Sequence, residues 1–298
     1  MADQVDLRQA PEVMSVPRRP GSSFIVPLLL SLVAIVTTLI AGTLLDQGGS
    51  VIDVLRAPSL LRHGLAYSAG ILGVLSVRSV ARSLVASAHG VRLSPPFILP
   101  APTMIGTLGD FANTEGLPQS RAVLFDVAIA APLAGFLASA GLAALGIAWS
   151  EPLDVGNNSP PLTEPLLFHW LVSMLKPEAI DIGLRWHPLA AAAWSGLLVT
   201  ALNLIPVGQL DGGHLAYALF GRAQPIISAI ALTTLVALGV VFSAYLWIIW
   251  VLIVLLLGYR HPPVQESRGG MGSGRYVLSA IAVAVLVVSF SIHSTAAQ

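Results

Sequence analysis

Cysteine is absent from this 298-residue sequence, and charged residues make up only 10% of it. Without cysteine the chain can form neither a disulfide nor a thiolate metal site, so any metal would need His, Asp or Glu ligands. Soluble domains carry about 25% charged residues. The shortage of charge and the hydrophobic content of 55% are therefore typical of a protein that crosses a lipid bilayer several times. The formal net charge of zero argues against nucleic acid as a partner.

The N-terminal stretch lacks the apolar core and the small-residue cleavage site of a signal peptide. It mixes acidic and basic side chains such as Asp3 and Arg18, and its acids also argue against an organelle transit peptide. We therefore expect a cytoplasmic tail over residues 1–23, a single transmembrane domain over 24–292 and a short tail over 293–298.

Apolar runs that can cross a bilayer recur along the chain. At about 1.5 Å per residue, a helix needs roughly 20 residues to cross the hydrocarbon core. The sequence predicts an all-α polytopic membrane protein with six to seven transmembrane helices. The expected spans are 24–45, a second that begins near Gly64, 123–149, 189–205, a hairpin of two within 225–258, and 276–292, with an interfacial helix over 165–175.

Prolines and glycines interrupt this pattern over residues 89–121. Pro95 and Pro96 exclude a helix there, because proline has no N–H and its ring clashes with the preceding turn. The runs 97–99 and 103–111 therefore predict short strands or a small re-entrant β-hairpin. Such backbone is allowed at membrane depth only where protein or water satisfies its hydrogen-bonding groups.

The most specific stretch is Asn203–His214, which reads Asn-Leu-Ile-Pro-Val-Gly-Gln-Leu-Asp-Gly-Gly-His. Pro206 ends the preceding helix, and the pair Gly212–Gly213 lets the backbone fold tightly. We expect Asp211 on irregular backbone near the membrane, followed by a short helix over 214–220. An ionisable group at that depth indicates a functional site. The alternative is that Asp211 only caps the next helix.

This stretch resembles the second metal motif of the site-2 protease family of intramembrane zinc metalloproteases. Three further stretches agree with the bacterial and chloroplast branch of that family, and the resemblance covers roughly residues 24–292. It implies the site-2 protease fold and a location in the bacterial cell (inner) membrane. Residues 89–97 are similar to the segment after the catalytic helix, 106–109 to the glycine-rich hairpin, and 125–135 to the third-span signature, with Ala131 where glycine is usual.

The resemblance implies that proteins of that family hold zinc with both histidines of His-Glu-x-x-His and with the aspartate of the second motif. Residues four apart share a helix face, so both imidazoles reach one metal while the Glu activates its water. Counted back from His89, this motif belongs at 78–82, where the chain reads Arg-Ser-Val-Ala-Arg. Arginine has no lone pair for zinc, and Ser79 lacks the acid–base range of a glutamate. Of the three expected ligands only Asp211 is left.

Arg78 and Arg82 share one helix face, because they are four residues apart. We expect their guanidinium groups to occupy the volume that zinc would fill and to neutralise Asp211; Asp110 and Asp126 are alternative partners. In the opposing interpretation the helix ends in water and both arginines reach the lipid headgroups. We expect no catalytic residue and no cofactor. The vestigial site would consist of Arg78, Ser79, Arg82 and Asp211.

Two functions stay open. The first is a pseudoprotease that binds or regulates a membrane protein partner by holding a transmembrane segment of it; the edge of the hairpin can hold an extended peptide by strand addition. The second is an active intramembrane zinc metalloendopeptidase with Asp211 and, as weak candidates, His214 and His89 as ligands. A solute transporter is disfavoured, because no matching pair of broken helices occurs. The groove candidates are Asn203, Pro206, Gly212, Gly213 and His214.

Overall fold

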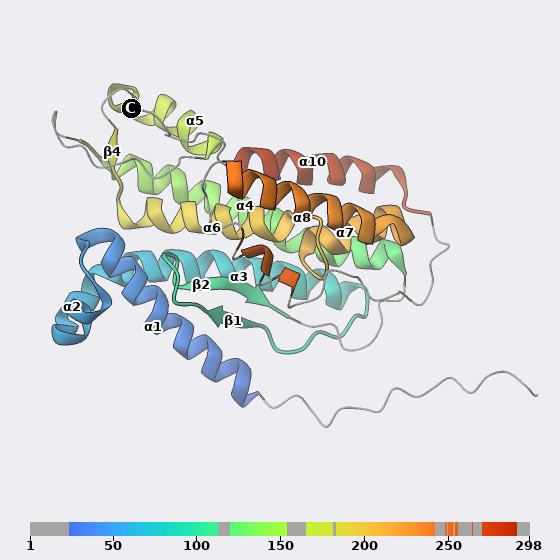
Figure 1. The fold of residues 1–298 in the computed structure, drawn as a ribbon, viewed down its shortest axis with the longest axis horizontal. Coiled ribbons are helices and arrows are strands. Elements are labelled where there is room, and N and C mark those ends of the chain that lie inside the picture. The colour runs from blue at the N-terminus through green and yellow to red at the C-terminus, as the bar shows by residue number, and fades with distance from the viewer. Residues whose placement is uncertain are drawn as a thin grey trace, which may run out of the picture.

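The computed structural model describes residues 24–112, 120–153, 165–180, 183–241, 248, 250–252, 254–255, 264 and 270–290. Helices dominate this part of the chain (Figure 1). The longer ones are α1 (Ile25–Gln47), α3 (Leu65–Ala88), α4 (Arg121–Ala148), α6 (Pro188–Leu204), α8 (Gln224–Val241) and α10 (Ser273–Ser289). The short ones are α2 (Val51–Arg56), α5 (Leu166–Leu175), α7 (Asp211–Phe220) and the 3-10 turns η1 (Pro58–Gly64), η2 (Pro177–Ala179) and η3 (Gly221–Ala223). The strands are β1 (Phe97–Pro100), β2 (Thr107–Phe111), β3 (Glu151–Pro152) and β4 (Leu184–Arg185).

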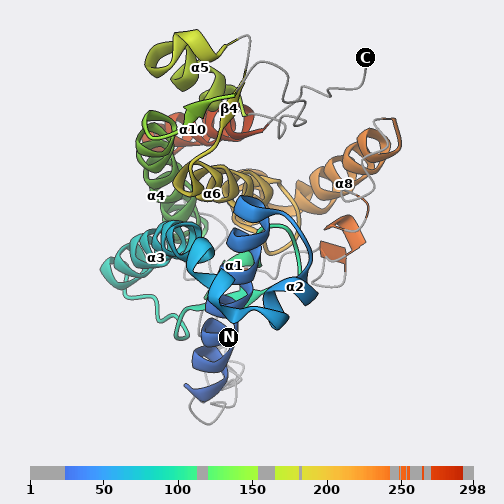
Figure 2. The ribbon, with the colours of Figure 1, turned by 90° about the vertical axis from the view of Figure 1, so that its left-hand side faces the viewer.

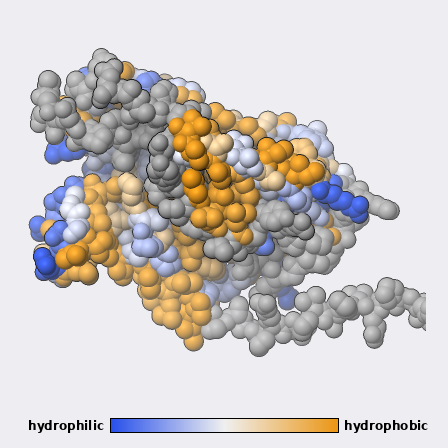
Figure 3. All heavy atoms as spheres, in the orientation of Figure 1, coloured by the Kyte–Doolittle hydropathy of each residue, from blue (hydrophilic) through white to orange (hydrophobic). Residues whose placement is uncertain are grey.

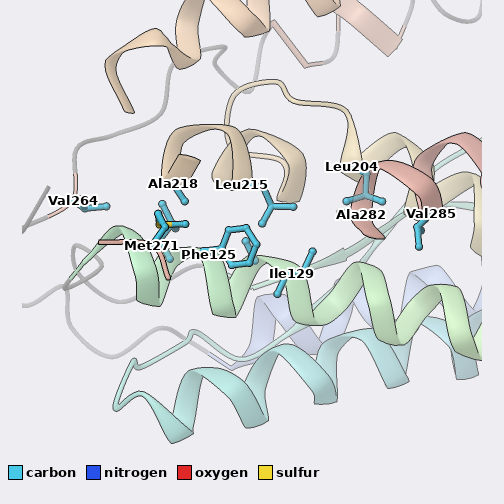
Figure 4. Packing of buried hydrophobic residues seen from close by; sticks show 11 residues of the cluster. Phe125, Ile129, Leu204, Leu215, Ala218, Val264, Met271, Ala282 and Val285 are labelled. Carbon is cyan, nitrogen blue, oxygen red and sulfur yellow. The ribbon is translucent and has the colours of Figure 1, made fainter. Parts of the chain in front are cut away.

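The long helices stack in layers. Figure 2 shows α4 and α6 between α10 on one side and α3 on the other, with α1 beside α3. The approach of α4 to α6 is close because Gly146 has no side chain: a Cβ there would lie 2.3 Å from the backbone nitrogen of Ala190. A buried cluster that includes Phe125, Ile129 and Leu215 joins α4 to α6, α7 and α10 (Figure 4). This packing fixes α7, and with it Asp211, against the centre of the bundle.

Four helical stretches among the described residues are long and apolar enough to cross a membrane. Apolar side chains are exposed along α1 and α8, where a bilayer would contact them (Figure 3). The fold is therefore the all-α polytopic architecture that the sequence predicts. The bend expected at 239–245 falls where α8 ends, and most of it lies outside the described residues. The four stretches are Ile25–Gln47, Pro58–Ala88, Arg121–Ala148 and Asp211–Val241, and shorter apolar helices are Leu166–Leu175, Pro188–Leu204 and Ser273–Ser289.

Helix α3 is continuous through both Arg78 and Arg82 and ends only at Ala88. Arg78 is fully buried, whereas the side chain of Arg82 is 12% exposed. The interpretation in which both arginines reach the lipid headgroups is therefore wrong. Acidic side chains from other elements neutralise the two guanidinium groups. The helix can therefore continue without placing unpaired charges in hydrocarbon.

Strands β1 and β2 form the expected antiparallel hairpin, in which Phe97 faces Phe111 and Leu99 faces Gly109. The register shifts after Leu99, and the Thr107 hydroxyl bridges this irregularity: it donates to the Leu99 carbonyl and accepts from the Gly109 N–H. Helix α1 holds the turn, because the Thr37 hydroxyl donates to the Gly106 carbonyl at 2.6 Å. A second small sheet, β3 with β4, is a feature that the sequence did not indicate.

Candidate functional site

Four charged side chains meet inside the bundle where α3 carries residues 78–82. Helix α3 supplies Arg78 and Arg82, strand β2 supplies Asp110, and α7 supplies Asp211. Two guanidinium groups balance two carboxylates, so the cluster is formally neutral. Neutrality and complete pairing matter here, because an unpaired buried charge costs several kcal/mol.

Arg78 is the centre of this cluster. Its Nε donates to Asp110 Oδ1 at 2.7 Å, and its Nη2 donates to Asp211 Oδ2 at 3.2 Å. Its Nη1 donates to the Thr200 hydroxyl of α6 at 3.0 Å. All three nitrogens of one side chain thus tie α3 to β2, α6 and α7. A glycine makes room for it: a Cβ on Gly135 of α4 would lie 2.6 Å from the Arg78 Cγ.

Arg82 and Ser79 complete the site from the same helix. The Nη2 of Arg82 donates to both carboxylate oxygens of Asp211, at 2.7 and 3.0 Å. The Ser79 hydroxyl donates to Asp110 Oδ2 at 3.1 Å. Both oxygens of each carboxylate are therefore hydrogen-bonded by side chains of α3.

The backbone around Asp211 differs from what we expected. Helix α7 begins at Asp211 rather than three residues later, so the carboxylate lies in the first helical turn and not on irregular backbone. Asp211 is not the cap either, because Leu210 occupies the N-cap position. Gly212 and Gly213 allow this early start: a Cβ on Gly212 would lie 2.0 Å from the Leu204 carbonyl oxygen, and one on Gly213 would lie 2.3 Å from that of Gly208. An acidic group in the first turn also suits the helix dipole.

A buried polar pair in α8 holds the turn before Asp211. The Ser228 hydroxyl donates to the Pro206 carbonyl at 3.0 Å and accepts from the Gly208 N–H at 3.4 Å. The Gln224 side chain donates to the same hydroxyl at 2.8 Å, and both polar side chains are fully buried. We did not identify these residues from the sequence; the available signal was a Gln and a Ser four residues apart on one face of an apolar helix.

Other candidate residues lie around or away from the cluster. Asn203 is buried, and its Nδ2 is 3.5 Å from where a Cβ on Gly109 would lie, so it faces the hairpin. His214 lies in α7, one turn after Asp211. His89 and Asp126 do not join the cluster. His89 Nε2 is 3.2 Å from Asp126 Oδ2, and Arg275 of α10 donates to both oxygens of Asp126.

Comparison with known proteins places this geometry in a family. The sequence profile of Peptidase family M50 matches residues 66–246, which contain all four charged members of the cluster. A "Probable zinc metalloprotease EGY3, chloroplastic" of Oryza sativa subsp. indica is 32% identical over 242 residues, which are 74% of this chain and 41% of that protein. The Arabidopsis thaliana "Probable zinc metallopeptidase EGY3, chloroplastic" is 30% identical over 225 residues, 70% of this chain and 39% of that protein. The chain thus spans about two fifths of the length of these relatives.

These relatives correct our expectation about the cofactor. We expected none, but the matching proteins are named zinc metalloproteases, so zinc belongs to the family. The residues around Asp211 do not fit this ion, because both carboxylate oxygens accept arginine N–H groups. Across the described ranges, no group of three His, Cys, Asp or Glu side chains is close enough to hold a metal.

The names also bear on the location. The relatives are named chloroplastic, which does not support the bacterial cell membrane that we expected. The coarser prediction holds: the chain is an integral membrane protein whose helices contact lipid. Since the family profile covers more than half of the sequence, and the helical membrane fold agrees with it, the chain belongs to Peptidase family M50, the site-2 protease family.

Proposed function

We propose that this chain is a pseudoprotease: a member of the site-2 protease family without hydrolytic activity, which binds or regulates a membrane protein partner. The observation that carries this proposal is the state of Asp211, whose two oxygens accept three N–H contacts from Arg78 and Arg82. These contacts use three of the roughly four lone-pair sites of the carboxylate, and the two guanidinium charges beside it repel a divalent metal. The guanidinium groups take the place of the ion and keep the carboxylates neutralised.

The position of the general base supports the same proposal. Ser79 stands where the resemblance expects a glutamate, and its hydroxyl donates to Asp110. A serine hydroxyl has no protonation range near neutral pH that lets it take a proton from water. Asp110 cannot replace the glutamate, because Arg78 and Ser79 already occupy both of its oxygens.

A partner has room beside the cluster. An open surface cavity of about 370 Å³ lies along α3, and a second open one of about 390 Å³ adjoins the segment before the hairpin. Ser79 belongs to the cluster and also lines the first cavity, so an occupant of the cavity would lie beside the cluster. The first cavity is lined by Ser79, Val80, Ser83, Leu84, Ser87 and Pro96.

The competing proposal is an active intramembrane zinc metalloendopeptidase, and the names of the relatives favour it. It needs Asp211 to exchange arginine for zinc and needs His214 or His89 to approach it. The pairing of His89 with Asp126 opposes this rearrangement.

The test is a cleavage assay on the detergent-solubilised full chain with zinc supplied, a transmembrane substrate, and Asp211→Asn beside the wild type. We expect the substrate to stay intact with both proteins. The zinc content of both preparations is measured in parallel. Stoichiometric zinc in the wild type, together with cleavage that Asp211→Asn abolishes, would overturn the pseudoprotease proposal and support the endopeptidase.

A further inference from the structure

Helix α5 is too short to cross a bilayer, yet it is firmly attached to helices that do. It has 10 residues, about half of what a crossing needs. One side of it is buried through Phe168 and Val172, which pack in a cluster with Ala143 and Ile147 of α4. The rings of Phe168 and Trp186 lie 5.0 Å apart between centroids. Helix α5 therefore lies against the bundle as a fixed element beside α4 and α10 (Figure 2).

The exposed half of α5 carries two stripes of different polarity. Leu166, Trp170 and Met174 are four residues apart, so they share one face of the helix. They are 36%, 49% and 80% exposed. His169 and Ser173, also exposed, form a second stripe that lies between this apolar stripe and the buried side. Around its axis the helix thus presents a protein-facing side, a polar side and an apolar side.

Neighbouring residues show at which level of the membrane α5 lies. The ion pair of Arg185 with Glu151, on β4 and β3, has side chains that are 74% and 67% exposed. Charges this exposed belong in water, because they are costly in hydrocarbon. Strand β3 follows the end of α4 at Ala148 by only three residues. The contacts of α5 with α4 start at Ala143, which is within about 8 Å of that end at 1.5 Å per residue.

We propose that α5 is an interfacial anchor. Its stripe of Leu166, Trp170 and Met174 inserts among lipids where headgroups meet acyl chains, and the stripe of His169 and Ser173 faces water. The inference depends neither on the absence of hydrolytic activity nor on a protein partner.

The arrangement of the three sides favours lipid as the occupant. A helix at the boundary has an apolar medium on one flank and water on the other, and this matches the two exposed stripes. Tryptophan is enriched at this depth, and Trp149, next to the end of α4, is also 59% exposed. Because the buried side of α5 is fixed to α4, the anchor also sets how deep the bundle lies in the bilayer.

The absence of cysteine allows a direct test, because one introduced cysteine gives one labelled position. Met174→Cys, in the full chain in lipid nanodiscs that hold one copy, is labelled with a nitroxide. Its accessibility is measured by electron paramagnetic resonance with oxygen, which concentrates in the acyl region, and with a water-soluble nickel chelate. Ser173→Cys is the matched control on the polar stripe. We expect the ratio of oxygen to nickel accessibility to be severalfold higher at position 174 than at position 173.

A second pair makes the result independent of one variant's folding. Trp170→Cys and His169→Cys should show the same contrast, with the higher ratio at position 170. Two further labels calibrate depth: Leu137→Cys, 70% exposed near the middle of α4, and Glu151→Cys on the water-exposed sheet. Positions 170 and 174 should lie between these two references.

Three results would overturn the anchor. Nickel accessibility at 170 and 174 as high as at 169 and 173 would place the apolar stripe in water. A ratio equal to that of Leu137→Cys would place α5 deep in the hydrocarbon instead of at its boundary. Labels at 170 and 174 that are immobile and closed to both reagents would mean that protein, and not lipid, covers the stripe.

Discussion

Two arginine–aspartate groups in this chain have similar chemistry and different surroundings. In the cluster, Arg78 and Arg82 meet Asp110 and Asp211 in the interior, where no member is more than 12% exposed. In the second group, Arg275 meets Asp126 with side chains that are 29% and 18% exposed. The first group ties α3 to β2 and α7, and the second ties α10 to α4. The two groups differ in how far water can hydrate the charges and salt can screen them.

The comparison explains why the interior group has a balanced composition. Near solvent, a surplus charge is screened. The group of Arg275, Asp126 and the adjacent His89 therefore does not need equal numbers of positive and negative charges. In the interior a surplus charge is expensive, so removal of one partner costs more than the pair contributes. Asp211 and Asp110 need positive charge in this interior position, and the two arginines supply it.

The largest expected effect comes from Arg78→Met, which removes the cation that touches both carboxylates. We expect the free energy of unfolding to fall by about 3–5 kcal/mol, because two buried carboxylates then share the charge of Arg82 alone. Equilibrium unfolding in mixed micelles with increasing SDS measures the loss.

Two variants make this comparison sharper. Arg275→Met breaks the partly exposed group and should cost less, about 1 kcal/mol. The double variant Arg78→Met with Asp110→Asn should recover part of the loss, since it also removes one negative charge. If Arg78→Met costs no more than Arg275→Met, the interior cluster contributes no more than a surface pair and the contrast is wrong.

A smaller effect is expected from Gly135→Ala, which fills the space beside Arg78. The new Cβ would lie 2.6 Å from Cγ and 2.9 Å from Cδ of Arg78. Arg78 cannot move aside freely, because its three nitrogens are held by three different elements. We expect a loss of about 1–3 kcal/mol, the usual cost of overpacking, in the same unfolding measurement.

Gly141→Ala is the matched control, because it lies on the same helix with nothing within 4 Å of its added Cβ. It should leave stability unchanged or raise it slightly through helix propensity. In an Arg78→Ala background, which lacks Cγ, the cost of Gly135→Ala should fall by about 1 kcal/mol or more. An undiminished cost in that background would show that the close contact with Arg78 is not its cause.

Local sequence patterns predict much of this fold and only part of the site. The apolar runs give the helices, the proline pair at 95–96 gives the break before the hairpin, and the spacing of Arg78 and Arg82 places both on one face. Thr200 and Ser228 could not be assigned, because each lies in an apolar helix and its role depends on which distant segment packs against it.

Asp211 shows why the rest could not be predicted. Proline and glycine around it favour irregular backbone, which is what we expected. The structure instead starts a helix at this residue, because the glycine pair lets the first turn pack against the Leu204 and Gly208 carbonyls. Whether glycine loosens a backbone or permits a close approach depends on the tertiary neighbour, and a local pattern does not contain that neighbour.

The smallest expected effect is that of Asp126→Asn in the partly exposed group, and its dependence on salt is the informative quantity. Removal of this carboxylate should cost about 0.2–1 kcal/mol at low ionic strength. The cost should decrease as the salt concentration rises, because salt screens partly exposed charges, and the direct contacts at 2.6 and 2.8 Å should retain part of it. Asp110→Asn, measured in parallel, should cost more and change little with salt, because water does not reach its oxygens. A loss for Asp126→Asn that is as large as that of Asp110→Asn and equally insensitive to salt would mean that exposure does not separate the two groups.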